Sequence, residues 1–126
     1  KAGTAQLDVD VAAFLVSADV ITGCAIDSLQ AKVSFDTTGT ISTDLTAAPQ
    51  TKNELGDAYG MVAYAGATYE WYVQAENFAA YITGKTLTEV ATIAVDEGTK
   101  ATDVDLATGC TIAIGGFQGL IAKAAQ

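Results

Sequence analysis

The chain has 126 residues, half of them hydrophobic, and a formal net charge of −9 at pH 7, so we expect one domain over residues 1–126. Such an acidic surface repels phosphate backbones, which argues against nucleic acid as a partner. There is no histidine, which excludes histidine triads and histidine zinc ligands, and no apolar run is long enough to span a membrane.

The N-terminal third predicts strands. Residues 5–16 alternate between apolar and polar side chains, which indicates a half-buried strand. Its expected buried face is Leu7, Val9, Val11, Ala13 and Leu15. A turn over residues 17–19 and a second strand over 20–26 would complete a hairpin, with a bulge at Gly23. We also expect a strand over 32–35 and a short return strand over 40–43.

The C-terminal two thirds predict a loop followed by helices. Residues 46–60 contain the only proline and show no periodicity, which indicates a long surface loop. A helix over 69–83 is predicted by an apolar stripe, with Thr68 as N-cap and Gly84 as stop. The stripe is Trp71, Ala75, Phe78, Ala79 and Ile82. Thr86 and Glu89 form a capping box before a short helix.

A last helix is expected within residues 113–125. Its predicted buried face is Phe117, Leu120, Ile121 and Ala124. Because strands come first and helices follow, the order favours an α+β fold. We therefore expect an N-terminal antiparallel sheet of hairpins, packed by two to three helices from the C-terminal half.

The stretch "DLATGCT" at residues 105–111 is the main functional candidate. It precedes the last predicted helix, where a hydroxyl group would meet backbone N–H groups that favour phosphate. The alternative is structural: Thr108 or Thr111 caps the helix, and Gly109 permits the turn.

This stretch resembles the Asp-x-x-Ser/Thr-Gly-Ala-Thr signature of the FMN-binding domain family. That family includes flavin-carrying subunits of redox-driven sodium pumps and exported lipoproteins of anaerobic bacteria. The resemblance implies FMN attached to Thr111 through a phosphoester bond by a flavin transferase, with Asp105, Thr108 and Gly109 as recognition positions. The chain departs from the signature at Cys110, which replaces alanine, and over the apolar residues 112–114.

Three further segments, 51–61, 69–86 and 93–107, are similar to small exported lipoprotein-type members of the family. The resemblance implies an extracytoplasmic domain, anchored by lipid through an N-terminal segment outside this sequence. Its function would be flavin carriage or accessory electron transfer to membrane redox proteins, with no turnover by the polypeptide. The alternative is a non-redox cell-surface module that kept the fold and lost the flavin.

The segment 52–61 is the second site candidate. In the family, a loop containing glutamate and glycine lies near the flavin, so the resemblance implies contacts from Glu54 and Tyr59. Lys52 and Asp57 are further polar groups of this segment. The aromatic side chains here are suited to stacking on an isoalloxazine ring: Tyr59, Tyr64, Tyr69, Trp71 and Tyr72. The alternative is that glycines make turns and the aromatic residues fill the core.

The two cysteines and the acidic residues complete the candidates. In an exported chain, Cys24 and Cys110 predict a disulfide, and the alternative is two buried free thiols. The late acidic residues match no calcium-loop spacing, so we expect a solvated loop and no metal site. They are Asp96, Glu97, Asp103 and Asp105.

Overall fold

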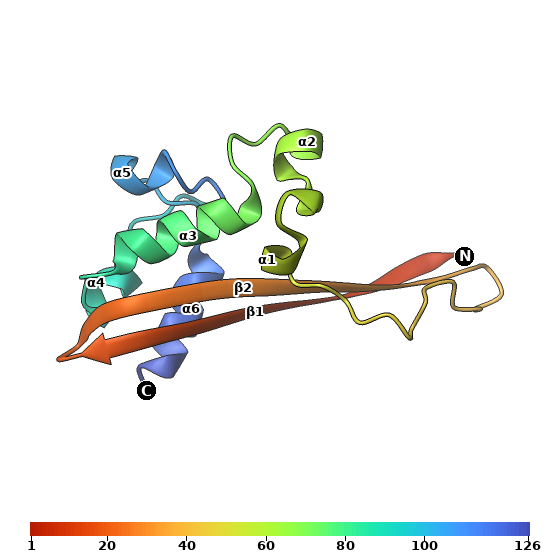
Figure 1. The fold of residues 1–126 in the computed structure, drawn as a ribbon, viewed down its shortest axis with the longest axis horizontal. Coiled ribbons are helices and arrows are strands. Elements are labelled where there is room, and N and C mark those ends of the chain that lie inside the picture. Colours follow the sequence, from red (N-terminus) through yellow and green to blue (C-terminus); the bar gives the residue numbers. More distant parts are fainter.

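A long β-hairpin lies against a set of short helices in the computed structural model, which describes residues 1–126 (Figure 1). Strands β1 (Gly3–Ser17) and β2 (Val20–Phe35) pair antiparallel in a two-stranded sheet. The helical elements follow as α1 (Lys52–Leu55), the 3-10 turn η1 (Gly56–Tyr59), α2 (Met61–Ala65), α3 (Trp71–Ile82), α4 (Leu87–Ala91), α5 (Val104–Ala107) and α6 (Gly115–Ala124). This arrangement confirms the predicted α+β class.

The hairpin is longer and simpler than predicted. Residues 32–35 continue β2 instead of forming a separate strand, and Phe35 pairs with Gly3 at the open end. The expected return strand over 40–43 is reduced to one bridge, between Phe35 and Ile41. The extra residue Thr22 makes an irregularity beside the predicted bulge position. The sheet therefore contains only β1 and β2, which are joined by one tight turn.

That connection is a two-residue turn, as residues 17–19 predicted. Ala18 and Asp19 have φ values of 49° and 66°. Two consecutive left-handed residues match the right-handed twist of a hairpin, and asparagine, aspartate and glycine are the usual residues there. Ala18 is the less favourable of the pair, because its side chain offers no local hydrogen bond to offset the left-handed backbone.

Replacing Ala18 with asparagine is expected to stabilise the protein by about 0.5–1 kcal/mol, because asparagine tolerates left-handed backbone. Urea denaturation measures the change. Ala2→Asn, on the exposed chain before β1, is the matched control and should leave the midpoint unchanged. An equal effect of both variants would contradict a gain specific to the turn.

The hairpin packs through the face opposite to the predicted one. The alternation is as expected, but Leu7, Val9, Val11 and Leu15 are 60%, 39%, 56% and 70% exposed. The helices instead contact the face that carries Ala12, Phe14, Cys24, Ile26 and Ser28. Strand β1 is apolar on both faces near its end, so the alternation did not determine which face the helices would cover.

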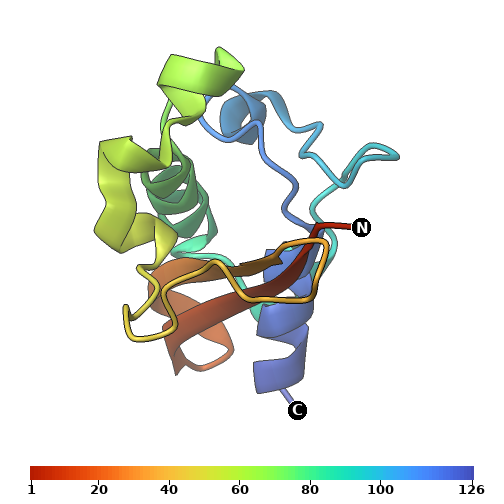
Figure 2. The ribbon, with the colours of Figure 1, turned by 90° about the vertical axis from the view of Figure 1, so that its right-hand side faces the viewer.

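Helix α3 lies at the centre of the core. The predicted apolar stripe of this helix is buried, and Gly84 ends it with φ of 89°. The Phe117 ring of α6 lies 5.3 Å from the ring of Phe78 and 6.1 Å from that of Trp71. In Figure 2, α3 lies over the hairpin and α6 runs beside it. On α6, Phe117 and Ile121 are buried as predicted, whereas Ala124 is exposed.

The predicted loop over 46–60 is corrected in its second half, which is helical. Thr51 and Glu54 form a capping box that starts α1, like the predicted and observed pair Thr86 and Glu89 at α4. The predicted N-cap at Thr68 is also wrong, because Glu70 takes that position in α3. None of the helices combines the length and apolar character needed to cross a membrane.

Candidate functional site

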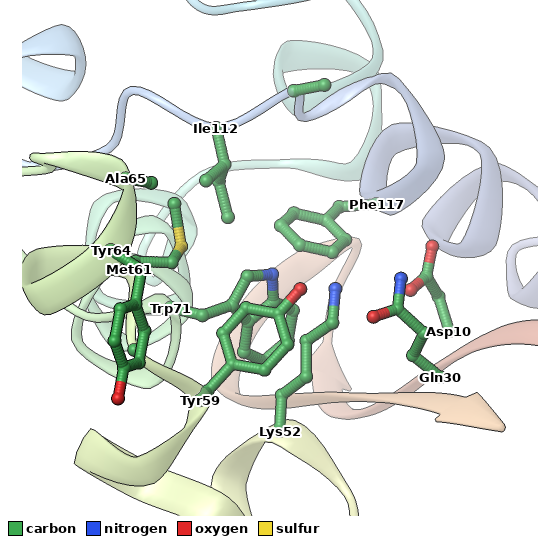
Figure 3. A pocket seen from close by; sticks show the side chains of 12 residues that line it. Asp10, Gln30, Lys52, Tyr59, Met61, Tyr64, Ala65, Trp71, Ile112 and Phe117 are labelled. Atoms are coloured by element: carbon green, nitrogen blue, oxygen red, sulfur yellow. The ribbon is translucent and has the colours of Figure 1, made fainter. Parts of the chain in front are cut away.

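A cavity of about 610 Å³ lies between the hairpin, the segment α1–α2 and the start of α6 (Figure 3). Its volume is within the range of roughly 300–1,000 Å³ that is typical of small-molecule sites. The walls are mainly apolar and aromatic, from Tyr59, Met61, Tyr64, Trp71, Ile112 and Phe117. The hairpin contributes the polar side chains of Asp10 and Gln30. This cavity is the most site-like feature of the molecule.

Lys52 supplies the cationic group of the cavity. Its Nζ atom lies 5.0 Å from the ring centroid of Tyr59 and 5.0 Å from that of Trp71. Figure 3 shows the side chain extending past Tyr59 toward Gln30 and Asp10. Lys52 is the first residue of α1. The capping box that fixes the start of this helix therefore also fixes the position of the Lys52 backbone. The interaction with two rings holds a positive charge at the cavity of an otherwise acidic protein.

The opposite wall includes Ile112, which follows the signature threonine directly. Thr111 is held by Gln74 of α3, whose Oε1 atom accepts hydrogen bonds from Thr111 N at 2.8 Å, Thr111 Oγ1 at 3.1 Å and Ile112 N at 3.2 Å. The Gln74 side chain is 1% exposed, and its Nε2 donates to Tyr69 O at 2.8 Å. Every polar atom of this buried amide therefore has a partner within the fold.

The other signature residues also have structural contacts. Thr108 Oγ1 donates to Asp105 O at 3.2 Å, within the last turn of α5. Gly109 O accepts from Asn77 Nδ2 at 2.9 Å. A Cβ atom on Gly109 would lie 2.9 Å from the same Asn77 nitrogen, so a larger residue here would displace the Asn77 side chain from its hydrogen bond. Neither Thr108 nor Thr111 caps α6, which has Ile114 at its N-cap, so the predicted cap is wrong, although both residues make hydrogen bonds within the fold.

In the predicted segment 52–61, some residues line the cavity and others only support the fold. Tyr59 lines the cavity, together with Trp71 and Tyr64. Glu54 does not line it: its carboxylate accepts a hydrogen bond from Thr51 N at 2.8 Å and completes the cap of α1. The hydroxyl of Tyr72 donates to Asp57 Oδ1 at 3.2 Å, outside the cavity. Only part of the predicted aromatic set is therefore available to a ligand.

Glu70 supports one wall of the cavity, and no pattern in the sequence identified this residue beforehand. Its buried carboxylate accepts hydrogen bonds from Met61 N at 2.8 Å and Val62 N at 3.0 Å. These are the first N–H groups of α2, the helix that brings Met61 and Tyr64 to the cavity wall. The carboxylate thus caps α2 from the start of α3.

The two cysteines are free thiols in the structure, which corrects the predicted disulfide. Cys110 is fully buried, and the half-buried Cys24 packs against the same core. Burial raises the pKa of the Cys110 thiol to about 11 and raises the pKa of Cys24 above its usual 9.0. Both thiols are protonated near neutral pH, and because the thiolate is the reactive form, they act as small apolar core groups.

The acidic residues after α4 make turns and a cap. Asp96 Oδ1 accepts from Lys100 N at 2.9 Å, and the side chain of Asp103 caps α5 through Asp105 N and Leu106 N. Across the structure, no group of three or more cysteine or carboxylate side chains is placed to hold a metal ion. These carboxylates therefore have local structural roles.

Comparisons of the chain with protein-family models, with curated proteins and with solved structures find no match. Function is inferred here from the side chains of the cavity and from the turn over 108–112 beside it. The cavity offers one cation from Lys52, one carboxylate from Asp10, aromatic faces and a few further hydrogen-bonding groups. That combination suits a flat ligand with an anionic group better than it suits acid–base catalysis.

Proposed function

We propose that this chain is a non-catalytic binding module and that FMN binds in the cavity. The observation that carries the proposal is the Lys52 ammonium, held over the faces of Tyr59 and Trp71 at the cavity wall. A phosphate would pair with the ammonium, and a flat ring would stack on the aromatic side chains. Bound flavin would supply electron transfer, while the polypeptide supplies position and exposure.

Covalent attachment at Thr111 is a separate part of the proposal. Thr111 is an exposed residue, but its hydroxyl donates a hydrogen bond to Gln74 Oε1. Attachment from a flavin dinucleotide would break its pyrophosphate bond, release the other nucleotide as the leaving group and join the FMN phosphorus to Thr111 Oγ1, whose proton and hydrogen bond to Gln74 are lost. Gln74 would keep the backbone N–H groups of Thr111 and Ile112 as donors, so the turn would retain its main support.

We further propose an extracytoplasmic location, with a lipid anchor and with membrane redox proteins as electron partners. The support is the resemblance of the signature and of the three longer segments to exported lipoprotein-type domains. The net charge of −9 favours partners with complementary basic surfaces. A flavin transferase would be needed only for the covalent form.

The cavity is tested by titrating the protein with FMN and with riboflavin, which lacks the phosphate. Trp71 is the only tryptophan and lines the cavity, so its fluorescence quenching reports binding directly. Lys52→Met is expected to weaken FMN binding by about tenfold or more, through loss of the ion pair, and to change riboflavin binding much less.

Lys123→Met is the control for this titration, because Lys123 is an exposed lysine near the end of α6. It removes the same charge from the chain and should leave FMN affinity nearly unchanged. If neither flavin quenches Trp71 at millimolar concentration, the proposed ligand is wrong. Equal losses of affinity in both lysine variants would mean that only net charge matters.

The covalent bond is tested by intact mass after co-expression with a flavin transferase. We expect the wild-type chain to gain the mass of one FMN group, and Thr111→Val to gain none. An unlabelled wild type, in cells where a known substrate is labelled, would refute attachment while leaving the cavity proposal standing.

The non-redox surface module is the second candidate function. It is favoured by one observation: the signature residues Thr108, Gly109 and Thr111 all make hydrogen bonds within the fold. A module that lost its flavin would still need these residues for the turn. A colourless protein that binds no added FMN would support this second candidate.

A further inference from the structure

A second, smaller hollow adjoins the large cavity and shares part of its wall. Its volume is about 300 Å³, at the lower end of the range typical of small-molecule sites. We call it the lysine hollow, and its polar and aromatic lining residues are Gln30, Lys32, Gln50, Lys52 and Tyr59. Gln30, Lys52 and Tyr59 also line the large cavity, and Figure 3 shows Lys52 lying between the other two. A ligand in the cavity can therefore extend past Lys52 into the hollow.

The lysine hollow contains two of the six basic residues of a chain whose net charge is −9. No carboxylate lines it, whereas Asp10 lines the large cavity. Lys32 and Lys52 would attract an anionic group into the hollow, and Asp10 would repel the same group from the cavity. Charge thus separates the two spaces: the cavity suits a flat apolar ring, and the hollow suits an anion.

The donors around the lysine hollow are positioned by regular structure. Lys32 follows Gln30 by two residues on β2, so their side chains lie on the same face of the hairpin, the face that borders both spaces. Lys52 is the first residue of α1. Gln50 adds two N–H groups, and the amide of Gln30 keeps one N–H group after donating the other to Asp8. Ammonium and amide groups together match the acceptor oxygens of a phosphate.

Asp8 is a carboxylate near both lysines that does not line the hollow. Hydrogen bonds from Gln6 and Gln30 lower the pKa of the Asp8 carboxyl most, and the charges of Lys52 and Lys32 lower it further. Both ammonium groups therefore lie near the same part of the hairpin. The Asp8 oxygens accept from Gln6 Nε2 at 3.0 and 2.8 Å and from Gln30 Nε2 at 3.1 Å. With one carboxylate beside two lysines, this region keeps a net positive charge.

We propose that the lysine hollow is the phosphate subsite of the ligand-binding site, with the phosphate group held between Lys32 and Lys52. The proposal rests on the proposed function for the ring, which stacks in the large cavity, and it adds a second cation and a direction for the ligand. It assigns the site to phosphorylated flat molecules and disfavours unphosphorylated ones. It concerns the reversibly bound ligand, because covalent attachment would place the phosphorus on Thr111, next to Ile112 in the opposite wall.

Inorganic phosphate tests the subsite without any flavin. Two-dimensional 1H–15N NMR should show the side-chain amides of Gln30 and Gln50 shifting saturably as phosphate rises to roughly 50 mM at constant ionic strength, a range suited to millimolar binding. Lys32→Met is expected to weaken this binding at least about threefold, through loss of one ion pair, whereas Lys32→Arg keeps the charge and should retain it. Amides that do not shift overturn the proposal.

Three further variants test whether charge at this place decides the affinity. Asp8→Asn removes the neighbouring repulsion and should strengthen phosphate binding about twofold or more. Glu97→Gln and Lys123→Met are the matched controls, because both residues are exposed and outside the hollow. They change the net charge by the same amounts and should leave the affinity close to that of the wild type. Equal losses in Lys32→Met and Lys123→Met would overturn the assignment to this hollow.

FMN and riboflavin distinguish a failure of the subsite from a failure of the proposed function. With Trp71 fluorescence as the readout, Lys32→Met should weaken FMN binding about threefold to tenfold and leave riboflavin binding nearly unchanged. If FMN binds but Lys32→Met weakens it no more than Lys123→Met does, the subsite is wrong and the flavin proposal stands. If phosphate shifts the amides and neither flavin binds, the subsite stands and the flavin is wrong.

Discussion

Replacing Gln74 with leucine is expected to lower the free energy of unfolding by about 3 kcal/mol or more, the largest effect that we predict for one side chain. The variant keeps the volume of the side chain but leaves Thr111 N, Ile112 N and Tyr69 O without their partner. These three hydrogen bonds are partly buried, so each group left without its partner costs about 1 kcal/mol or more. Urea denaturation measures the loss.

Asn77→Ala is the control for this prediction. Asn77 lies on the same helix and supports the same turn, but through one hydrogen bond, to Gly109 O. We expect it to cost about 1 kcal/mol. Hydrogen exchange of the Thr111 and Ile112 amides should accelerate in Gln74→Leu more than in Asn77→Ala. If the two variants are equally stable, Gln74 is not the main support of the turn.

The stripe on α3 shows what periodicity can detect. Residues spaced three and four apart predicted the helix and five of its buried side chains, because transfer of apolar groups from water dominates burial. Gln74 occupies the same stripe, three residues after Trp71. Its burial depends on partners 37 residues away, at Thr111, and no local pattern specifies such a partner. A polar residue inside an apolar stripe was the available signal.

The hairpin shows a different limit. Alternation predicted a strand correctly, but the buried face depends on where the helices pack, which is a tertiary choice. Phe14 and Ala12 on one face compete with Leu15 and Ala13 on the other, so the pattern is nearly symmetric there. Asp8 and Asp10 led us to expect that their face of the hairpin is exposed. At that end of the hairpin, however, the same face borders the cavity.

Part of the cavity wall comes from the predicted segment 52–61. Tyr59 was expected to contact a ligand and lines the cavity, and Lys52 was noted as a polar group of the same segment. Glu54 was expected beside the ligand and instead completes a capping box, the same signature that correctly predicted the start of α4. Pro49 and two glycines concealed that signal, because they favour a loop on composition alone.

Replacing Glu70 with alanine is expected to lower the free energy of unfolding by about 2–3 kcal/mol, the second largest effect that we predict. The carboxylate is 7% exposed and accepts two backbone hydrogen bonds at the start of α2. Hydrogen bonds to a charged group contribute about 1.5–3 kcal/mol, and α2 has no other side-chain cap. Thermal and urea unfolding measure the loss.

Glu76→Ala is the matched control, because Glu76 is an exposed glutamate of the same helix. It should change stability by less than about 0.5 kcal/mol. In Glu70→Ala, hydrogen exchange at the amides of Met61 and Val62 should accelerate more than exchange at the amides of α3, because the lost hydrogen bonds are those at the start of α2. That local loosening would also remove one wall of the cavity, so FMN affinity should fall in Glu70→Ala and stay constant in Glu76→Ala. A global loss of stability with unchanged exchange at Met61 and Val62 would contradict the capping role.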